Sequence, residues 1–400
     1  MSNNRIIGYD VARSLALLGM IFISYWGLMK RFMEDCSPPE WVDFFMKTIE
    51  GRPAVMFVTL AGVGLYLLSR AACSSHDPVR IAENRETLMR RALFLFFVGM
   101  LNSLITPWDI LHFYAVYFMI AAYLVTASNR RLWVVISSVV VVFALFMVLI
   151  RFQRGDDWVS IKPMNLWHLP GVFYHLFFCG IYSIFPWIGF LCIGIWLGRH
   201  DLTNRPFRRK ILFVSILVVI AAEAVSRIFF SITNGWHTLK LGRLIPWLDL
   251  NPWEPMPLFF FSGAGTAIIG ICLCVMLTEK LKNAKWLLPF AIVGQTTLTL
   301  YLAHTIVGWA ALTVMNLMGI QSPLFPVWGP VLFFAAGLIF CHRWNRRFNR
   351  GPLELIIRAF AALPVKLPVP RLGAFFGKVR ACWKAGVQRK RCPGVRPAGL

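Results

Sequence analysis

Long apolar segments follow one another through most of this chain, separated by short polar connections. Each is roughly 17 residues or longer, enough for a helix to cross the ~30 Å hydrocarbon core of a bilayer. Hydrophobic residues make up 58% of the 400 and charged residues 15%, which is too little charge to cover soluble domains. We therefore predict an all-α, polytopic transmembrane helix bundle of about ten spans. The predicted spans lie near 9–29, 52–70, 91–107, 109–127, 132–150, 173–198, 211–232, 256–278, 287–317 and 324–342.

The distribution of Lys and Arg predicts the orientation of this bundle. The connections after the second, fourth, sixth and eighth spans are rich in basic residues, whereas "TPWD" after the third and "GIQSPLFP" after the ninth contain none. Since cytoplasmic loops carry the excess of Lys and Arg, both termini are expected to face the cytoplasm. The first span carries Asp10 and Arg13 near its start, and no small-residue cleavage site follows it. It is therefore expected to remain as a helix and not to be removed as a signal peptide.

The chain carries a formal net charge of +23, which by itself would suit a nucleic-acid-binding protein. Most of the excess, however, lies in the predicted cytoplasmic loops and in the tail from Arg343 to Arg396, where topology and anionic lipid explain it. We therefore expect no nucleic-acid partner, and the oligomeric state stays open. The predicted organisation is a single transmembrane domain over 1–350, an amphipathic interfacial helix over 351–363 and a poorly ordered, basic cytoplasmic tail over 364–400.

The nine cysteines are not expected to form a disulfide framework, because only Cys36 falls in a predicted external loop. Cys272 and Cys274 are two residues apart on one predicted helix and so point to different faces. The sequence contains no Walker loop, Ser elbow or HExxH motif. We therefore predict no metal site and no bound cofactor, and any chemistry must come from polar residues of the spans.

One histidine lies deep in the ninth predicted span. Counted from the start of that span at about 1.5 Å per residue, His304 is about 22 Å along a helix that rises from the cytoplasmic side. The fourth span enters from outside, with Asp109 at its N-cap and His112 one turn further on the same face. Because these depths are similar, we predict an outward-facing polar pocket with His304, His112 and Asp109 as catalytic candidates. Arg52 and Trp108, at neighbouring outer edges, are candidates for binding an acceptor or an anion.

Each of these residues also has a purely structural interpretation. Asp109 suits a helix N-cap, and Arg52 suits an interfacial side chain that reaches for water. An ionisable residue as deep as His304 normally faces the bundle interior and marks a functional site. A structural hydrogen bond to a neighbouring helix competes with that interpretation, and the sequence leaves both open.

Two further groups of charges stand out. Glu223 and Arg227 are four apart in the seventh span and are predicted to form an intramembrane ion pair, either as a structural pair or along an ion or substrate route. At the cytoplasmic ends of several spans, arginines and one aspartate would form a mouth suited to a phosphate-rich donor. Positive-inside topology alone also predicts basic residues there. The residues of this predicted donor mouth are Asp10, Arg13, Arg90, Arg91 and Arg199.

Four segments resemble the YeiB-like family of bacterial inner-membrane proteins. They are "RIIGYDVARSLALLGMIFISY", "FPWIGFLCIGIWLGR", "VGQTTLTLYLAH" and "RFNRGPLELIIR", which follow the family's order. The resemblance extends over nearly the whole chain. The combination of a first-helix Asp-x-x-Arg with a terminal Gly-Pro-Leu-Glu is fairly specific. The resemblance implies a multi-pass protein of the bacterial inner membrane. It also implies a relation to integral-membrane acyltransferases, such as bacterial sugar O-acyltransferases and heparan-glucosaminide N-acetyltransferase.

Such a relation implies transfer of an acyl group from cytoplasmic acyl-CoA, as co-substrate, to a hydroxyl or amine of a small-molecule or glycan acceptor on the far side of the membrane. It assigns no catalytic residue, because those relatives have their key histidine in or near early helices and the first span here contains none. His304 or His112 would serve as general base, with Asp109 orienting the imidazole. The same pocket would also suit a proton-coupled transporter or exporter. A non-catalytic membrane partner protein is a third alternative.

Overall fold

The computed structural model places a helix at each of the predicted spans and no strand among the residues that it describes. These residues belong to the first of two units, Met1–Ala362, except for Leu363 in the second unit, Leu363–Leu400. The predicted basic tail over 364–400 lies outside them. The described residues are 6–32, 38–75, 77–106, 109–154, 182–233, 248, 250–252, 256–281, 284–309 and 323–363.

The helices follow the apolar patterning of the sequence, and several of them begin at proline. In chain order they are α1 (Ile7–Phe32), α2 (Glu40–Ile49), α3 (Arg52–Ser75), α4 (Pro78–Ser103), α5 (Leu111–Leu124), α6 (Asn129–Arg154), α8 (Ile184–Gly198), α9 (Arg205–Thr233), α10 (Pro257–Lys280), α11 (Leu287–Gln295), α12 (Thr297–Ala303), the π-helical η4 (His304–Trp309), α14 (Phe325–Asn345) and α15 (Pro352–Ala361). Proline occupies the first turn of α4, α10, α14 and α15, where its missing N–H has no intrahelical partner to lose.

The polytopic, all-helical architecture is confirmed. Six segments among the described residues are long and apolar enough to cross a membrane, and α11 with the following helix forms a seventh if the pair, bent by 79°, counts as one span. Two shorter apolar helices, α5 and α8, lie at further predicted spans. The count of ten and the cytoplasmic location of both termini stay predictions. α15 lies within the predicted 351–363 segment, and its location at the membrane surface likewise stays a prediction.

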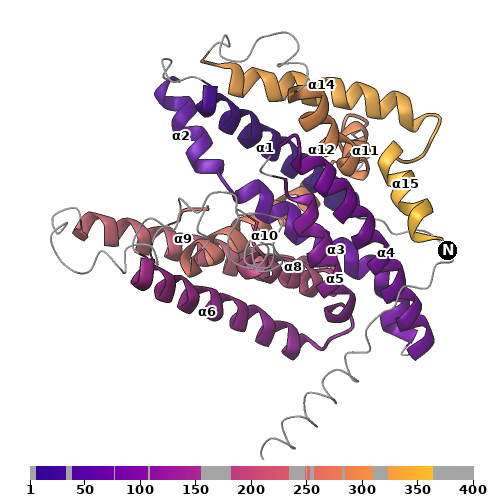
Figure 1. Ribbon diagram of the computed structural model, residues 1–400, viewed down its shortest axis with the longest axis horizontal. Coiled ribbons are helices and arrows are strands. Elements are labelled where there is room, and N and C mark those ends of the chain that lie inside the picture. The colour runs from indigo at the N-terminus through magenta and orange to yellow at the C-terminus, as the bar shows by residue number, and fades with distance from the viewer. Residues whose placement is uncertain are drawn as a thin grey trace, which may run out of the picture. The chain divides into compact units, whose positions relative to one another are not determined.

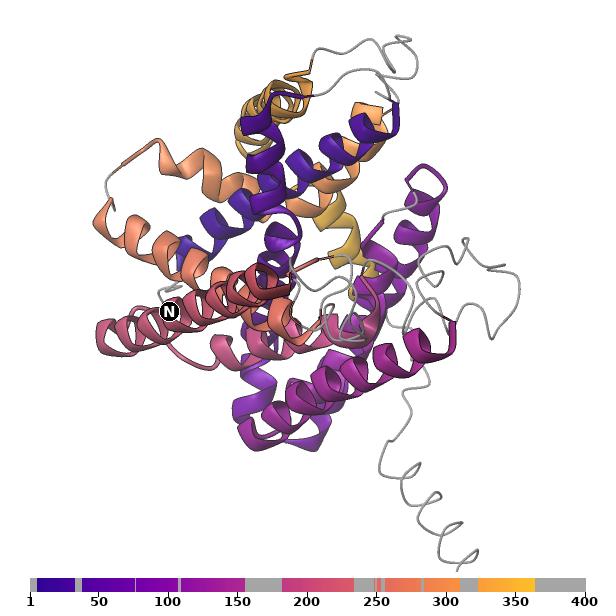
Figure 2. The same cartoon turned by 90° about the vertical axis from the view of Figure 1, so that its left-hand side faces the viewer.

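α1 and α3 lie at the centre of the helix packing. α1 contacts α2, α3, α10, α11, α12 and α14, while α3 packs along α8. Figures 1 and 2 show α11 to α15, in orange and yellow, and α6, α8 and α9, in magenta to red, on different sides of α1 and α3. The outer helices carry exposed apolar side chains on the faces that do not pack against other helices. Examples are Phe213, Ile220 and Ile228 of α9, which suit contact with lipid.

Small residues allow the closest helix contacts. An added Cβ at Gly194 of α8 would overlap the backbone of Thr59 on α3, and one at Gly62 would overlap the backbone of Leu191. On α11, a Cβ at Gly294 would overlap the backbone of Asp10 on α1. Because lipid supplies no hydrophobic drive for helices to associate, such close van der Waals contact is a main source of their packing energy.

The contact at Gly194 yields a first prediction. Gly194→Ala is expected to destabilise the fold by about 1 to 3 kcal/mol, because the backbone of α3 cannot move aside without losing its packing on α8. Gly270→Ala is the matched control, since its added Cβ would meet the flexible side chain of Met56 at 3.2 Å. The measurement is the melting temperature of each purified variant in detergent. Equal melting temperatures for the two variants would contradict this role of the contact.

Candidate active site

Asp109 is the centre of a buried polar cluster between α4, α5 and α12. Its carboxylate accepts hydrogen bonds from Leu111 N at 2.9 Å and His112 N at 3.2 Å, in the first turn of α5. The N-cap residue is Ile110, so Asp109 lies one residue before its predicted N-cap position. Asn102 Nδ2 donates to its Oδ1 at 2.7 Å, and His112 Nδ1 lies 3.1 Å from its Oδ2. Asp109 is 1% exposed, so these donors take the place of water around the carboxylate.

Tyr301 connects this cluster to His304. The Tyr301 hydroxyl donates to Asp109 Oδ1 at 3.4 Å, and the rings of Tyr301 and His304 have their centroids 5.1 Å apart. One turn further, Thr305 Oγ1 donates to Asn102 Oδ1 at 2.8 Å. The structure thus brings the predicted residues Asp109, His112 and His304 into one contiguous group, joined through Tyr301.

His304 begins η4, a π-helical turn of a kind that is frequent at functional sites. Its Nδ1 makes a hydrogen bond with the backbone carbonyl of Tyr301. Since a carbonyl oxygen can only accept, the proton of the neutral imidazole is on Nδ1, and Nε2 keeps its lone pair. The ring is buried, and its hydrogen bond to Tyr301 fixes the tautomer in which Nε2 is the basic atom.

His304 lines a cavity of about 210 Å³ beside the second half of α1, which we call the His304 cavity. Much of its wall is aromatic. The indole Nε1 atoms of Trp26 and Trp187 are buried and have no hydrogen-bond partner among the described residues. Buried donors without a partner are rare in proteins, which sets these two cavity-lining residues apart. The cavity is also lined by Ser24, Lys30, Glu50, Thr106, Tyr182, Tyr301 and Thr305.

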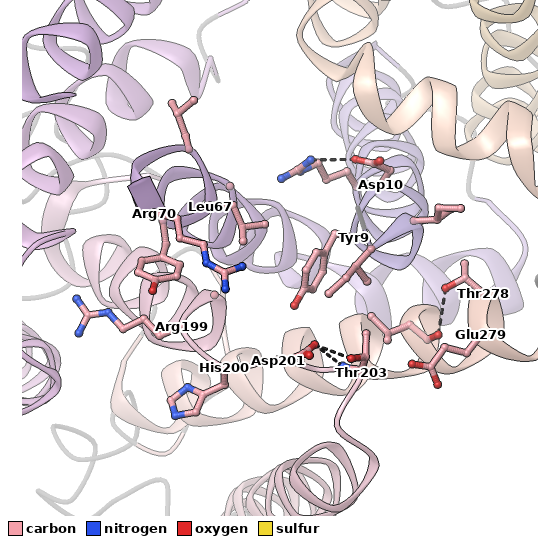
Figure 3. Close-up of a pocket in the computed structure, with 18 residues that line it drawn as sticks. Tyr9, Asp10, Leu67, Arg70, Arg199, His200, Asp201, Thr203, Thr278 and Glu279 are labelled. Atoms are coloured by element: carbon pink, nitrogen blue, oxygen red, sulfur yellow. Dashed lines mark hydrogen bonds and ion pairs between the residues drawn. The ribbon is translucent and has the colours of Figure 1, made fainter. Parts of the chain in front are cut away.

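A larger cavity of about 910 Å³ lies beside the first half of α1, and we call it the arginine cavity. Figure 3 shows Tyr9, Arg70 and Asp201 around one space, carried by α1, α3 and the connection between α8 and α9. A cavity of this size is at the upper end of the range for small-molecule and cofactor sites. Its charged lining residues are Asp10, Arg13, Arg70, Arg199, Asp201 and Glu279.

The cations of the arginine cavity differ in how they are engaged. Arg13 Nη1 lies 3.1 Å from Asp10 Oδ1. Arg199 donates to the backbone oxygens of Val125 and Ala127, and its other Nη donates to Asn129 Oδ1 at 2.6 Å. Arg70 is exposed and has no ion pair with any described residue. Arg70 is therefore the cation most available to an anionic ligand.

A third cavity, of about 350 Å³, shares lining residues with both of the others and is called the bridging cavity. It shares Arg13, Gly64 and Leu68 with the arginine cavity, and it shares Tyr301 with the His304 cavity. Its wall is largely apolar, with Arg91 among its charged lining residues. The cavities therefore form a series along the bundle, in which Tyr301 stands between the bridging cavity and His304.

The predicted donor mouth is divided in the structure. Arg91 lines the bridging cavity, whereas Arg90 lines neither it nor the arginine cavity. Arg90 instead pairs with Glu86 at 3.0 Å and donates to Ala361 O at 3.1 Å. The members of the mouth that line the arginine cavity are Asp10, Arg13 and Arg199.

Arg52 forms an ion pair across helices. Its Nη2 lies 2.6 Å from Glu223 Oε1, and its Nη1 donates to Ser262 Oγ at 3.2 Å. The structure therefore corrects the predicted pairing of Glu223 with Arg227, which is exposed. The four-residue spacing of Glu223 and Arg227 permits an ion pair along α9. Glu223 instead pairs with the guanidinium of Arg52 on α3, which also donates to Ser262 of α10. Trp108, predicted to lie beside Arg52, is outside the described residues.

The sequence pattern does not identify three members of the cluster. Two of them, Tyr301 and Thr305, could have been found. They are four apart in "LYLAHT" and so share a helix face. Asn102 carries no such signal, because its contact with Asp109 depends on how the chain returns from α4 into α5. Arg70 is not identified for another reason. Positive-inside topology predicts arginine in all of these connections, so the sequence does not distinguish a ligand-binding arginine from the others.

Two family models match different parts of this chain. The family described as "Heparan-alpha-glucosaminide N-acetyltransferase, catalytic" matches residues 5–222, and the family described as "Protein of unknown function (DUF418)" matches residues 196–364. The "Uncharacterized protein YxaH" of Bacillus subtilis (strain 168) is 20% identical over 415 aligned positions, covering 90% of this chain and 94% of that protein. The YeiB-like resemblance and its relation to acyltransferases are confirmed. Because the first match spans more than half of the chain, this protein belongs to the family of the heparan-alpha-glucosaminide N-acetyltransferase catalytic domain, a membrane acyltransferase-like family.

Proposed function

We propose that this protein transfers an acyl group from acyl-CoA, bound in the arginine and bridging cavities, to a hydroxyl or amine held in the His304 cavity. The observation that carries this proposal is the position of His304, which has a fixed tautomer and lies across Tyr301 from a series of cavities that begins among arginines. Family membership supports the reaction class. With the predicted orientation, the donor enters from the cytoplasm of a bacterium and the acceptor from the far side of the inner membrane.

The donor is expected to place its phosphates in the arginine cavity. Guanidinium groups bind phosphate through charge-assisted hydrogen bonds, and Arg70 has no competing ion pair among the described residues. The thioester then has to reach Tyr301. From Arg13 to Ser24, which line the two ends of this route, α1 advances by about 17 Å, and the bridging cavity lies in between. A donor with a long, flexible arm fits this arrangement.

The chemistry requires one base and one leaving group. His304 Nε2 takes the proton of the acceptor O–H or N–H as the acceptor oxygen or nitrogen attacks the thioester carbonyl. The C–S bond breaks, the acyl group stays on the acceptor, and the CoA sulfur receives the proton from the imidazolium. The Tyr301 carbonyl accepts from Nδ1 throughout and so stabilises the imidazolium that forms between these steps.

The acceptor is expected to be rich in oxygen. Ser24, Lys30, Glu50 and Thr106 line the His304 cavity and offer polar contacts to hydroxyl groups. Aromatic side chains with a small number of polar groups are typical of specific small-molecule sites. A sugar or another polyhydroxylated group at the end of a glycan meets these requirements.

The donor half can be tested with the purified full-length protein in nanodiscs. Arg70→Gln is expected to weaken binding of acetyl-CoA or palmitoyl-CoA by about tenfold or more, because a charged hydrogen bond to phosphate is lost. Arg209→Gln, which removes an exposed arginine outside the cavity, is the matched control and should leave the Kd unchanged. The measurements are isothermal titration of each acyl-CoA and the release of CoA thiol.

A folded protein that binds neither acyl-CoA would contradict the proposed function. The polar residues around His304 would then be better explained by the alternative of proton-coupled transport, which responds to a gradient and not to acyl-CoA.

A further inference from the structure

The chain bends by 79° between α11 and α12, next to the residues of the candidate active site. A helix that starts anew at such a bend leaves the N–H groups of its first turn without intrahelical partners. At the start of α12, two of these N–H groups have a partner from a distant part of the chain. Leu298 N and Thr299 N donate to Glu354 Oε1 of α15 at 2.8 and 3.1 Å.

The contact between Glu354 and Thr299 involves both side chains. Thr299 Oγ1 donates to Glu354 Oε2 at 2.6 Å, and the same hydroxyl accepts from Leu353 N at 3.1 Å. The carboxylate and the hydroxyl therefore satisfy the first turns of α12 and α15 together. This reciprocal arrangement fixes both the position and the register of one helix against the other.

The Gly-Pro-Leu-Glu sequence is suited to this contact. Gly351 is the N-cap of α15, and an added Cβ there would overlap Thr296 Cγ2 and the carboxylate of Glu354. Pro352 begins the helix, and Leu353 packs against the main apolar core. At the other end of α15, Ala361 O accepts a hydrogen bond from Arg90 of α4. α15 is thus held at both ends while it presents Glu354 to the bend.

We infer that Glu354 is a positioning residue, which holds the half-helix of Tyr301 and His304 at the angle the site requires by capping its first turn from α15. Its contacts at Leu298 and Thr299 are within one turn of Tyr301, whose carbonyl in turn fixes the His304 ring. A negative charge at a helix N-terminus is also stabilised by the helix dipole. The kinetic part of this inference rests on the proposed acyl transfer, whereas its structural part does not.

The electrostatic environment of Glu354 agrees with this role. Burial raises the pKa of the Glu354 carboxyl above its ordinary value, and hydrogen bonds from Thr299 and Leu298 oppose that rise. A partly buried carboxylate is retained when several donors satisfy it, as here. Arg91 and Arg350 line the same bridging cavity as Glu354 and add positive charge nearby.

The structural test is hydrogen–deuterium exchange of the full chain in nanodiscs. In Glu354→Ala, the amides of Leu298 and Thr299 are expected to exchange about 5- to 30-fold faster, which is the effect of losing a helix cap. Glu354→Gln keeps one acceptor oxygen and is expected to fall between wild type and Glu354→Ala. Glu83→Gln, which changes an exposed carboxylate on α4, is the matched control. Unchanged exchange in Glu354→Ala would overturn the inference.

The kinetic test separates positioning from simple stability. Glu354→Ala is expected to lower kcat by about 10- to 100-fold and to change the KM for acyl-CoA much less, because His304 moves while the arginine cavity, which Glu354 does not line, stays intact. Glu354→Gln should restore part of the loss. Thr299→Val should lower kcat too, and combining it with Glu354→Ala should add little, because both remove the same contact. Faster exchange with wild-type kcat would overturn the positioning role.

Should the wild-type protein show no acyl transfer, the proposed function fails and this inference is decided by chemical modification. Diethyl pyrocarbonate reacts with imidazole nitrogen, and mass spectrometry follows its addition to His304. Glu354→Ala is expected to change that rate by about fivefold or more, whereas Glu83→Gln leaves it at the wild-type value. An unchanged rate in Glu354→Ala would overturn the inference independently of any activity.

Discussion

Replacing His304 with alanine is expected to lower acyl transfer by about 10²- to 10⁴-fold without changing the affinity for acyl-CoA, because the general base is lost while the donor cavities remain. His304→Asn makes the same test with less structural change. Its amide N–H can still donate to the Tyr301 carbonyl that holds Nδ1, but it has no basic nitrogen. Turnover is measured as release of CoA thiol in nanodiscs, with a hexosamine as acceptor.

His112 is the matched control for this prediction. It is buried and its Nδ1 lies 3.1 Å from Asp109 Oδ2, but it lines none of the three cavities. His112→Asn is therefore expected to reduce turnover less than His304→Asn does. The opposite order, with turnover lost in the His112 variant and kept in the His304 variant, would contradict the assignment of His304 as the base.

The largest effect on stability is expected at Asp109. Asp109→Ala removes the acceptor for two backbone N–H groups and for the side chains of Asn102 and Tyr301, so it should destabilise the fold by about 2 to 4 kcal/mol. Asp109→Asn keeps one acceptor oxygen and should lose less. Because Tyr301 and His304 share this cluster, turnover is expected to fall as well. The measurement is the melting temperature of each variant in detergent.

Asp43 offers a matched carboxylate outside the cluster. It pairs with Lys47 at 2.6 Å along α2, where solvent screens the pair, and Asp43→Ala is expected to change stability by about 1 kcal/mol or less. If the Asp109 and Asp43 variants melted at the same temperature, Asp109 would not be the structural centre described here.

Much of the fold is predictable from the sequence because the bilayer restricts it. Apolar length and basic loops predict the helical spans and their order, and a helix is found at each of them. The break in the ninth predicted span is harder to foresee. Gln295 and Thr296 are compatible with a continuous helix, and Glu354, which makes hydrogen bonds at the bend, lies 55 residues from Thr299 in the sequence.

The site is predictable to a smaller extent. Depth alone brings Asp109, His112 and His304 to one level, and the structure shows that they also share a cluster through Tyr301. Depth cannot show which helix faces meet, so it does not distinguish the histidine at the cavity from the histidine beside it. The partner of Glu223 illustrates the same limit, because spacing along α9 indicates Arg227 whereas packing against α3 provides Arg52.

Transfer across the membrane requires donor and acceptor to be on opposite sides, and a vesicle experiment that separates the two sides tests it. Oriented vesicles would carry the wild-type protein with the arginine cavity facing outward, a hexosamine trapped inside and labelled acetyl-CoA outside. The wild-type protein is expected to leave free CoA outside and labelled acyl-hexosamine inside, and His304→Asn is expected to form neither product. Labelled product on the side of the donor, or product formation that survives His304→Asn, would contradict it.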